Sequence, residues 1–188
     1  DYATRHNAVL AMSRAQAGRN DISLSPQSIR TAPPTRRLVL PSPNGSTIAW
    51  HLGSSVPTVL GASLRNAGAV AAWISGQRDA SATSVAIVAA GEHWPDGAIR
   101  PAVEDLWGAG CLLSSLYRRG WTDLSPEAAV ARLAYDGVAT EVGAQLRACA
   151  SGLELIDNGY ADDVEVAAEV GLSRSVPILR GNRFVGAS

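Results

Sequence analysis

The stretch RRLVLPSPNGSTIAWHL, from Arg36 to Leu52, contains the change of pattern on which the fold depends. It opens with an apolar run suited to a buried strand and then breaks into the small residues Pro-Ser-Pro-Asn-Gly-Ser-Thr. An apolar pattern resumes after the break with a different period. The stretch therefore predicts a strand, a polar loop and then a second element, and it raises the question of what the polar loop does.

The same alternation of β-type and helical runs continues along the chain. Ser25-Pro26 could start a brief helical turn, and Ser125 stands as a helix N-cap before a proline. Strands separated by helices with short connections predict an α/β domain with a mostly parallel sheet covered on both faces. The expected strands are 7–12, 37–40, 57–63 and 85–90, the expected helical segments are 64–76, 99–120, 125–137, 140–151 and 161–170, and a hairpin is expected at 175–186.

The composition limits the classes of function. A length of 188 residues favours one domain, and a net charge of −1 without any basic stripe disfavours nucleic acid as a partner. All 16 basic side chains are arginines, so single guanidinium groups remain available for a small anion. No apolar run approaches 18 residues, and Cys111 and Cys149 have no CxxC spacing. We expect a cytoplasmic protein with reduced thiols and no membrane span.

Three polar loops follow three expected strands, at 42–47, 63–66 and 91–94. In a parallel sheet these loops emerge together at the carboxyl edge, where open α/β sheets bind ligands. In the first loop, Asn44 precedes Gly45, which allows close backbone approach, and Ser42, Ser46 and Thr47 supply hydroxyl groups near a helix N-terminus. This chemistry favours an anion, although Asn44-Gly45 is also the signature of a type I′ hairpin turn.

Charged side chains accompany the second and third loops. Arg65 could bind an anion with its planar fork, or it could be a surface cation, and Asn66 beside it could be only a loop cap. Glu92, Glu104 and Asp105 lie near one expected strand edge, an oxygen-rich set of the kind that Mg²⁺ accepts. Adjacent helical residues point about 100° apart, so Glu104 and Asp105 do not both face one ion without help. A solvated surface role is the alternative for each carboxylate.

Four stretches give the chain a family resemblance. LPSPNGSTIA, SLRNAGAVA, VAAGEHWPDGAIRPAVEDLWGAG and SRSVPILRGNRFVG resemble the 2-phosphosulfolactate phosphatase family, in that order and over most of the chain. The segment from Ala90 to Gly110 is the most specific, because its Ala-Gly-Glu, Asp-Gly, Arg-Pro and Glu-Asp elements recur together. The resemblance implies a three-layer α/β/α fold with a mostly parallel or mixed sheet. It also implies Mg²⁺-dependent hydrolysis of 2-phospho-3-sulfolactate to sulfolactate and phosphate.

The resemblance also implies roles for individual residues. Ser42, Asn44, Gly45, Ser46, Arg65 and Asn66 would bind the anionic substrate, and Glu92, Glu104 and Asp105 would be catalytic and hold Mg²⁺. Family members begin with a strand carrying an Asp-Val-Leu-Arg-like segment, and nothing here corresponds to it. We therefore expect a single α/β domain at 1–188 that lacks an N-terminal unit, which leaves the nucleophile or general base unassigned.

Two hypotheses follow from these observations. The first is a Mg²⁺-dependent phosphatase for a small phosphorylated, sulfonated acid, with a homodimer as one option for its assembly. The alternative is a small-anion binding or regulatory module of the same fold without turnover.

Overall fold

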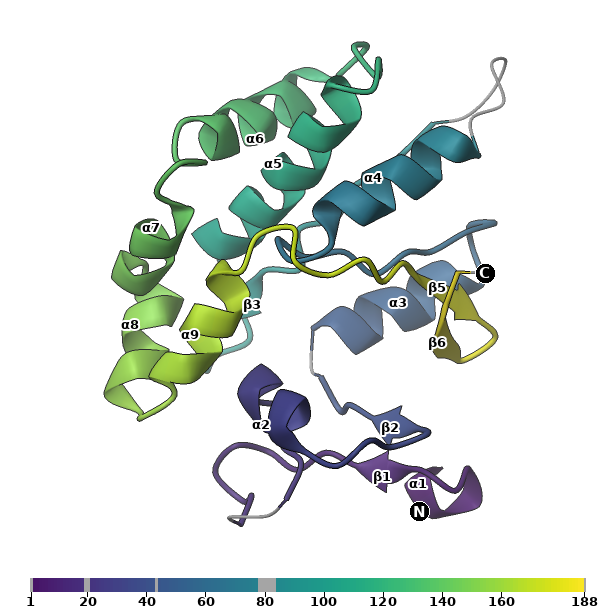
Figure 1. Ribbon diagram of the computed structural model, residues 1–188, viewed down its shortest axis with the longest axis vertical. Coiled ribbons are helices and arrows are strands. Elements are labelled where there is room, and N and C mark those ends of the chain that lie inside the picture. Colours follow the sequence, from purple (N-terminus) through teal and green to yellow (C-terminus); the bar gives the residue numbers. More distant parts are fainter. Residues whose placement is uncertain (1, 19–20, 43, 78–83, 188) are drawn as a thin grey trace.

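The computed structural model describes residues 2–18, 21–42, 44–77 and 84–187 and shows mixed helix and strand (Figure 1). The helices are α1 (Tyr2–Arg5), α2 (Pro26–Thr31), α3 (Gly45–Gly53), α4 (Ala67–Gly76), α5 (Val103–Tyr117), α6 (Pro126–Asp136), α7 (Val142–Ala148), α8 (Ala150–Asp157) and α9 (Ala161–Ala168). The strands are β1 (Val9–Leu10), β2 (Leu38–Val39), β3 (Glu92–His93), β4 (Ile99–Arg100), β5 (Pro177–Arg180) and β6 (Arg183–Gly186).

Two helices begin where the Ser-Pro pairs predict. Ser25 caps α2 and Ser125 caps α6, and each side chain accepts a hydrogen bond from the backbone N–H three residues on. Proline follows each cap at the first helical position, where no intrahelical N–H bond is lost. The sequence prediction is confirmed at both helix starts, because the signal is local and does not depend on tertiary packing.

The strands form three separate pairs within the described part of the chain. β1 pairs with β2 in parallel, whereas β3 with β4 and β5 with β6 are antiparallel, the last pair being the expected C-terminal hairpin. The run 57–63 joins β5 only through the bridge between Leu60 and Ile178. The pairs do not merge into the mostly parallel sheet expected from the sequence.

The run 85–90 shows why the mostly parallel sheet is not confirmed. It was expected as a buried strand, but its described residues have no ladder partner, and Val88 is 56% exposed. Val85 and Ile87 pack against the core with one face only. A short apolar run has no periodicity that distinguishes a paired strand from an extended segment with one buried face.

The core lies among α4, α5, α7 and α9. Val70 and Ala71 of α4 are fully buried, and they share one apolar cluster with Leu112 of α5, Leu146 of α7 and Val164 of α9. Burying a side chain of this size contributes about 1.5–3 kcal/mol. In Figure 1, α5 and α6 lie side by side next to α4, and α7, α8 and α9 form the opposite flank.

The helix expected at 140–151 is two helices. Cys149 ends α7 and caps α8 with extended backbone, at φ −72° and ψ 162°. The first turn of α8 lies against the last turn of α7, and a Cβ on Gly152 would lie 1.8 Å from the Leu146 carbonyl oxygen. The apolar period runs through this junction without change, so the sequence pattern alone did not reveal the break.

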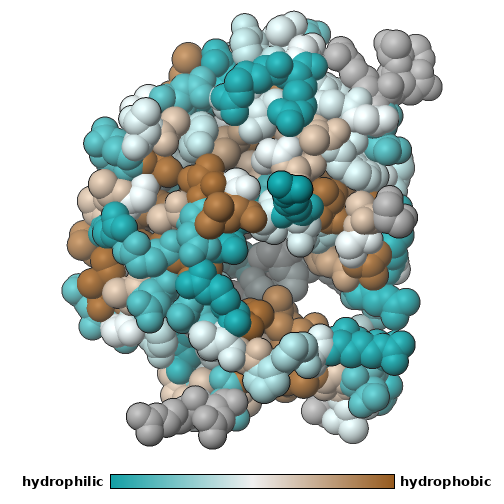
Figure 2. All heavy atoms as spheres, viewed as in Figure 1, coloured by the Kyte–Doolittle hydropathy of each residue, from teal (hydrophilic) through white to brown (hydrophobic). Residues whose placement is uncertain are grey.

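The N-terminal segment is joined to α9 by polar contacts. Arg14 pairs with Asp163 at 3.0 Å, and Arg30 of α2 pairs with Glu169 at 2.6 Å. The space-filling view is hollowed at its centre, between these N-terminal elements and the helices above them (Figure 2). Within the described residues, no helix combines the length and apolar character needed to cross a bilayer.

Candidate active site

Asn44 links the start of α3 to β3. Its Nδ2 donates to the Gly91 carbonyl and to Glu92 Oε2, both at 3.0 Å, and its Oδ1 lies 3.1 Å from His93 Nδ1. Because α3 begins at Gly45, the alternative of a hairpin turn at Asn44-Gly45 is wrong. The N-terminus of α3, with its positive partial charge, therefore lies next to the Glu92 carboxylate.

Asp105 anchors the other side of β3. It lies in the first turn of α5, and its Oδ2 accepts a hydrogen bond from the Gly91 N–H at 2.8 Å. Burial raises the pKa of Asp105, the Gly91 N–H opposes that shift, and the carboxylates of Glu104 and Glu92 add to it. The first and third polar loops thus meet at residues 91–93, and they are two of the three loops that the sequence predicts to converge.

Glu104 faces the junction between α7 and α8. Its Oε2 lies 3.9 Å from Cys149 Sγ, which also contacts the Leu146 carbonyl at 3.2 Å. Burial is the main cause of the raised pKa of the Cys149 thiol, and the Glu104 charge adds to the rise. Cys149 and Cys111 are both buried and unpaired, as expected.

A pocket of about 310 Å³ lies between the start of α5 and the helices α7 to α9. Glu92 and Glu104 contribute carboxylates to it, and Arg14 and Arg100 contribute guanidinium groups. The remaining lining residues are Leu146, Cys149, Ser151, Gly152, Glu154, Leu155, Val164 and Ala167. A pocket with both charge signs can hold an anion and a cation together, as phosphate esters and their divalent ions require.

Arg100 has two of its five N–H donors bound to neighbouring side chains. Nη1 donates to Glu154 and Nη2 to Ser151, each at 3.2 Å, and the guanidinium lies 5.5 Å from the centre of the Trp94 ring. This side chain is held firmly on one wall of the pocket.

Arg65 and Asn66 have protein partners away from the pocket lining. Arg65 pairs with Glu169 and donates to the Val166 carbonyl at 3.1 Å, so an anion at Arg65 would compete with Glu169. Asn66 is buried and bonds the backbone of Gly61, Ser63 and Ser175. Their assignment as anion ligands stays a prediction.

The first loop has its own internal contacts. The Ser46 hydroxyl donates to the Ser42 carbonyl, and among the described residues only Ser42 Oγ lies near the Cβ position of Gly45, the first residue of α3. The Ser46 hydroxyl therefore already has an acceptor.

Two carboxylates of this site, and not three, are placed to hold a magnesium ion. Within the described ranges, no three side chains of His, Cys, Asp or Glu are grouped to hold a metal. Glu92 and Glu104 line one pocket, and Mg²⁺ is commonly held by one or two carboxylates with water and substrate oxygens completing the octahedron. The donor set therefore fits an ion held by these two residues, while Asp105 supports Gly91.

Sequence reasoning missed the other polar residues of this pocket, which are Arg14, Arg100, Cys149, Ser151 and Glu154. Arg100 lies in the stretch that carries the family resemblance, so the sequence could have indicated it as a candidate site residue. Arg14 has no local pattern around it, because its partner Asp163 is 149 residues away.

Known proteins match most of the chain. A family model described as 2-phosphosulpholactate phosphatase matches residues 15–182, which confirms the resemblance. A curated protein of Thermus thermophilus described as "Probable 2-phosphosulfolactate phosphatase" is 33% identical over 164 residues. That match covers 87% of this chain and 65% of the relative, so the chain spans somewhat less than two thirds of the relative's length. The chain belongs to the 2-phosphosulpholactate phosphatase family.

Proposed function

We propose that the protein is a Mg²⁺-dependent phosphoric monoester hydrolase that converts 2-phosphosulfolactate to sulfolactate and phosphate. Membership of the family and the name of the relative support the reaction. The observation that carries the proposal is the pocket in which Glu92 and Glu104 face the same space as Arg14 and Arg100. A three-layer α/β/α architecture, a cytoplasmic location and the absence of a nucleic-acid partner are proposed for the full-length protein on the sequence alone.

In this proposal the carboxylates of the pocket hold the ion, and its guanidinium groups bind the anionic substrate. Mg²⁺, when bound by Glu92 and Glu104, supplies positive charge to the phosphoryl oxygens. Asn44 fixes Glu92 by donating to Oε2, and no hydrogen bond to Oε1 is found among the described residues. Asp105 holds the backbone at Gly91 and so fixes the position of the adjacent residue Glu92. The guanidinium groups bind substrate anions and stabilise the charge that develops on them.

The test is phosphate release by the full-length protein from 2-phosphosulfolactate, with Mg²⁺ varied. Glu92→Gln removes a negative charge that the ion needs, and we expect it to raise the Mg²⁺ concentration at half-maximal activity by roughly tenfold or more. Glu165→Gln is the matched control, because Glu165 is an exposed carboxylate that pairs with Arg147 and does not line the pocket.

The outcomes separate the two hypotheses. Hydrolysis that needs Mg²⁺, with a shift in Glu92→Gln and none in Glu165→Gln, supports the proposal. Binding of the substrate without phosphate release at any Mg²⁺ concentration would favour the small-anion binding or regulatory module instead.

A further inference from the structure

Arg14 enters the pocket with the end of its side chain unpaired. Its Nε donates to Asp163 Oδ2 at 3.0 Å, and its guanidinium lies 5.6 Å from the centre of the Tyr160 ring. No other side-chain contact of Arg14 is found within residues 2–18, 21–42, 44–77 and 84–187, so neither Nη atom has a partner there. The side chain lines the pocket and is 32% exposed.

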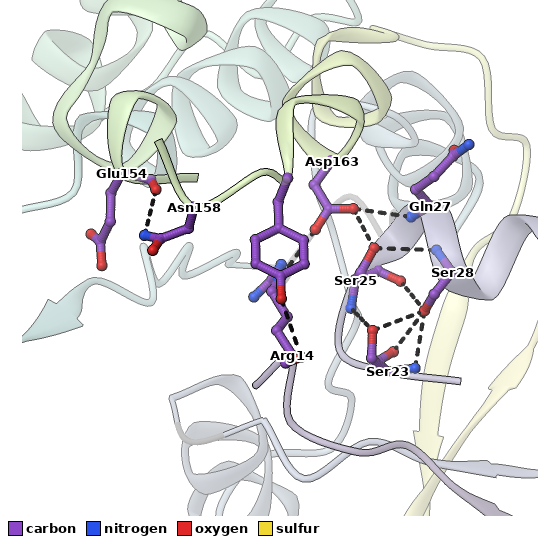
Figure 3. Close-up of polar contacts among 9 residues, drawn as sticks. Arg14, Ser23, Ser25, Gln27, Ser28, Glu154, Asn158 and Asp163 are labelled. Carbon is purple, nitrogen blue, oxygen red and sulfur yellow. Dashed lines mark hydrogen bonds and ion pairs between the residues drawn. The ribbon is translucent and has the colours of Figure 1, made fainter. Parts of the chain in front are cut away.

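The position of Arg14 is fixed by a buried polar network (Figure 3). Asp163 is only 3% exposed, and it accepts hydrogen bonds from the Ser25 hydroxyl and from the Gln27 N–H at 3.3 Å. The Tyr160 hydroxyl donates to the Arg14 carbonyl at 3.1 Å, which holds the backbone as well. Asp163 accepts from three donors, and the one from Arg14 is Nε. Asp163 therefore orients the guanidinium while both Nη atoms stay available for an anion.

The two arginines of the pocket therefore differ in what they can still bind. Arg100 already uses both Nη atoms on Glu154 and Ser151, whereas Arg14 uses only Nε toward the residues that the structure describes. Paired Nη donors match two oxygens of a carboxylate or sulfonate in one plane. Arg14 is the better placed of the two for direct recognition of an anion.

Resting on the proposed function, we propose that Arg14 binds the acidic group of the substrate that is not transferred, the sulfonate or the carboxylate. Glu92 and Glu104, on the same pocket, would face the phosphate through the ion. Arg14 would then decide which phosphate ester is accepted, and Asp163 would be the residue that positions it.

The experiment measures KM and kcat for 2-phosphosulfolactate in the full-length protein with Arg14→Gln, Arg14→Lys and Asp163→Asn. We expect Arg14→Gln to raise KM roughly 10- to 100-fold, as the loss of a charge-assisted pair predicts, and Arg14→Lys to fall between it and the wild type. Arg147→Gln is the matched control, because Arg147 also pairs with α9, through Glu165, but lies outside the pocket lining. Thermal unfolding of each variant establishes that it is folded. If Arg14→Gln does not fold, the KM of Arg14→Lys tests the proposal instead.

A second substrate identifies the group that Arg14 binds. 2-Phospholactate keeps the carboxylate and lacks the sulfonate. If the KM penalty of Arg14→Gln disappears with 2-phospholactate, Arg14 binds the sulfonate, and if the penalty persists, Arg14 binds the carboxylate. An Arg14→Gln variant with the KM of Arg147→Gln on 2-phosphosulfolactate would overturn the proposal.

Calorimetric binding of sulfolactate separates this proposal from the phosphatase reaction itself. Sulfolactate carries both acidic groups and no phosphate, so its affinity should fall in Arg14→Gln and stay unchanged in Arg147→Gln, even if the protein releases no phosphate. Equal affinity in both variants, or no binding by the wild type, would overturn the role of Arg14.

Discussion

The side-chain amide of Asn66 bonds three backbone groups in two segments of the chain. Its Oδ1 accepts from the Ser63 N–H at 2.7 Å, and its Nδ2 donates to the carbonyls of Gly61 and Ser175, each at 3.1 Å. The side chain is 7% exposed, so water does not readily replace these bonds. The residue that the sequence predicts as an anion ligand thus has a structural role in the described chain.

Asn66→Ala should lower the free energy of unfolding by at least about 1–3 kcal/mol, because it leaves buried backbone groups without partners. Chemical denaturation measures the change. Asn158→Ala is the control, since Asn158 is exposed and, among the described residues, its side chain bonds only the Glu154 carbonyl four residues before it. A normal stability of Asn66→Ala combined with weak substrate binding would instead favour the anion-ligand role.

The contact between α5 and α6 depends on the absence of a side chain at Gly110. A Cβ there would lie 2.2 Å from the Ala131 carbonyl oxygen and 2.6 Å from Tyr135 Cβ. Atoms at these distances overlap, so any side chain at position 110 would push the two helices apart. Tyr135 and Cys111 lie in the same part of the core, and burial raises the pKa of both.

Gly110→Ala should therefore destabilise the protein by about 1–3 kcal/mol or more, through overpacking. Gly108→Ala is the matched control on the same helix, because a Cβ at position 108 meets nothing within 4 Å. We expect that control to be neutral or stabilising by up to about 1 kcal/mol, as alanine is the better helix former. Denaturant midpoints of both variants test the prediction, and equal losses would show that the helices can separate freely.

At the scale of the whole molecule, Glu169 joins three parts of the chain. It follows α9 and pairs with Arg30 of α2 and with Arg65, which precedes α4. The guanidinium of Arg30 is the main cause of the lowered pKa of Glu169, and Arg65 contributes as well. The folded protein therefore holds Glu169 ionised more firmly than the unfolded chain does.

This lowered pKa predicts a pH dependence of stability. The stabilisation from Glu169 is present above its ordinary pKa of 4.5 and is lost as the pH falls through the lower folded value. Glu169→Gln should lower the melting temperature at pH 7, and its difference from the wild type should shrink below pH 4. Arg30→Gln should show the same trend. A difference that does not change with pH would contradict the pairing.

The features that sequence predicts well in this chain are local. The Ser-Pro pairs gave the starts of α2 and α6, and the run from Ala90 to Gly110 pointed to the family. The partners of Arg14 and Arg65 are more than 100 residues away, and no local pattern encodes them. The mostly parallel sheet is not confirmed, because strand pairing is a property of two segments, whereas the apolar pattern describes only one.

The pairing of Arg14 with Asp163 also affects how the protein is made. The two residues are 149 positions apart, so the pocket wall that Arg14 forms cannot exist until α9 has been synthesised. Chains emerge from the ribosome at about 5–20 residues per second, so the early segment waits for several seconds at least without its partner. Contacts between such distant residues also slow folding, because the loop between them must close first. Binding competence should therefore appear late in biogenesis, only after α9 has been synthesised.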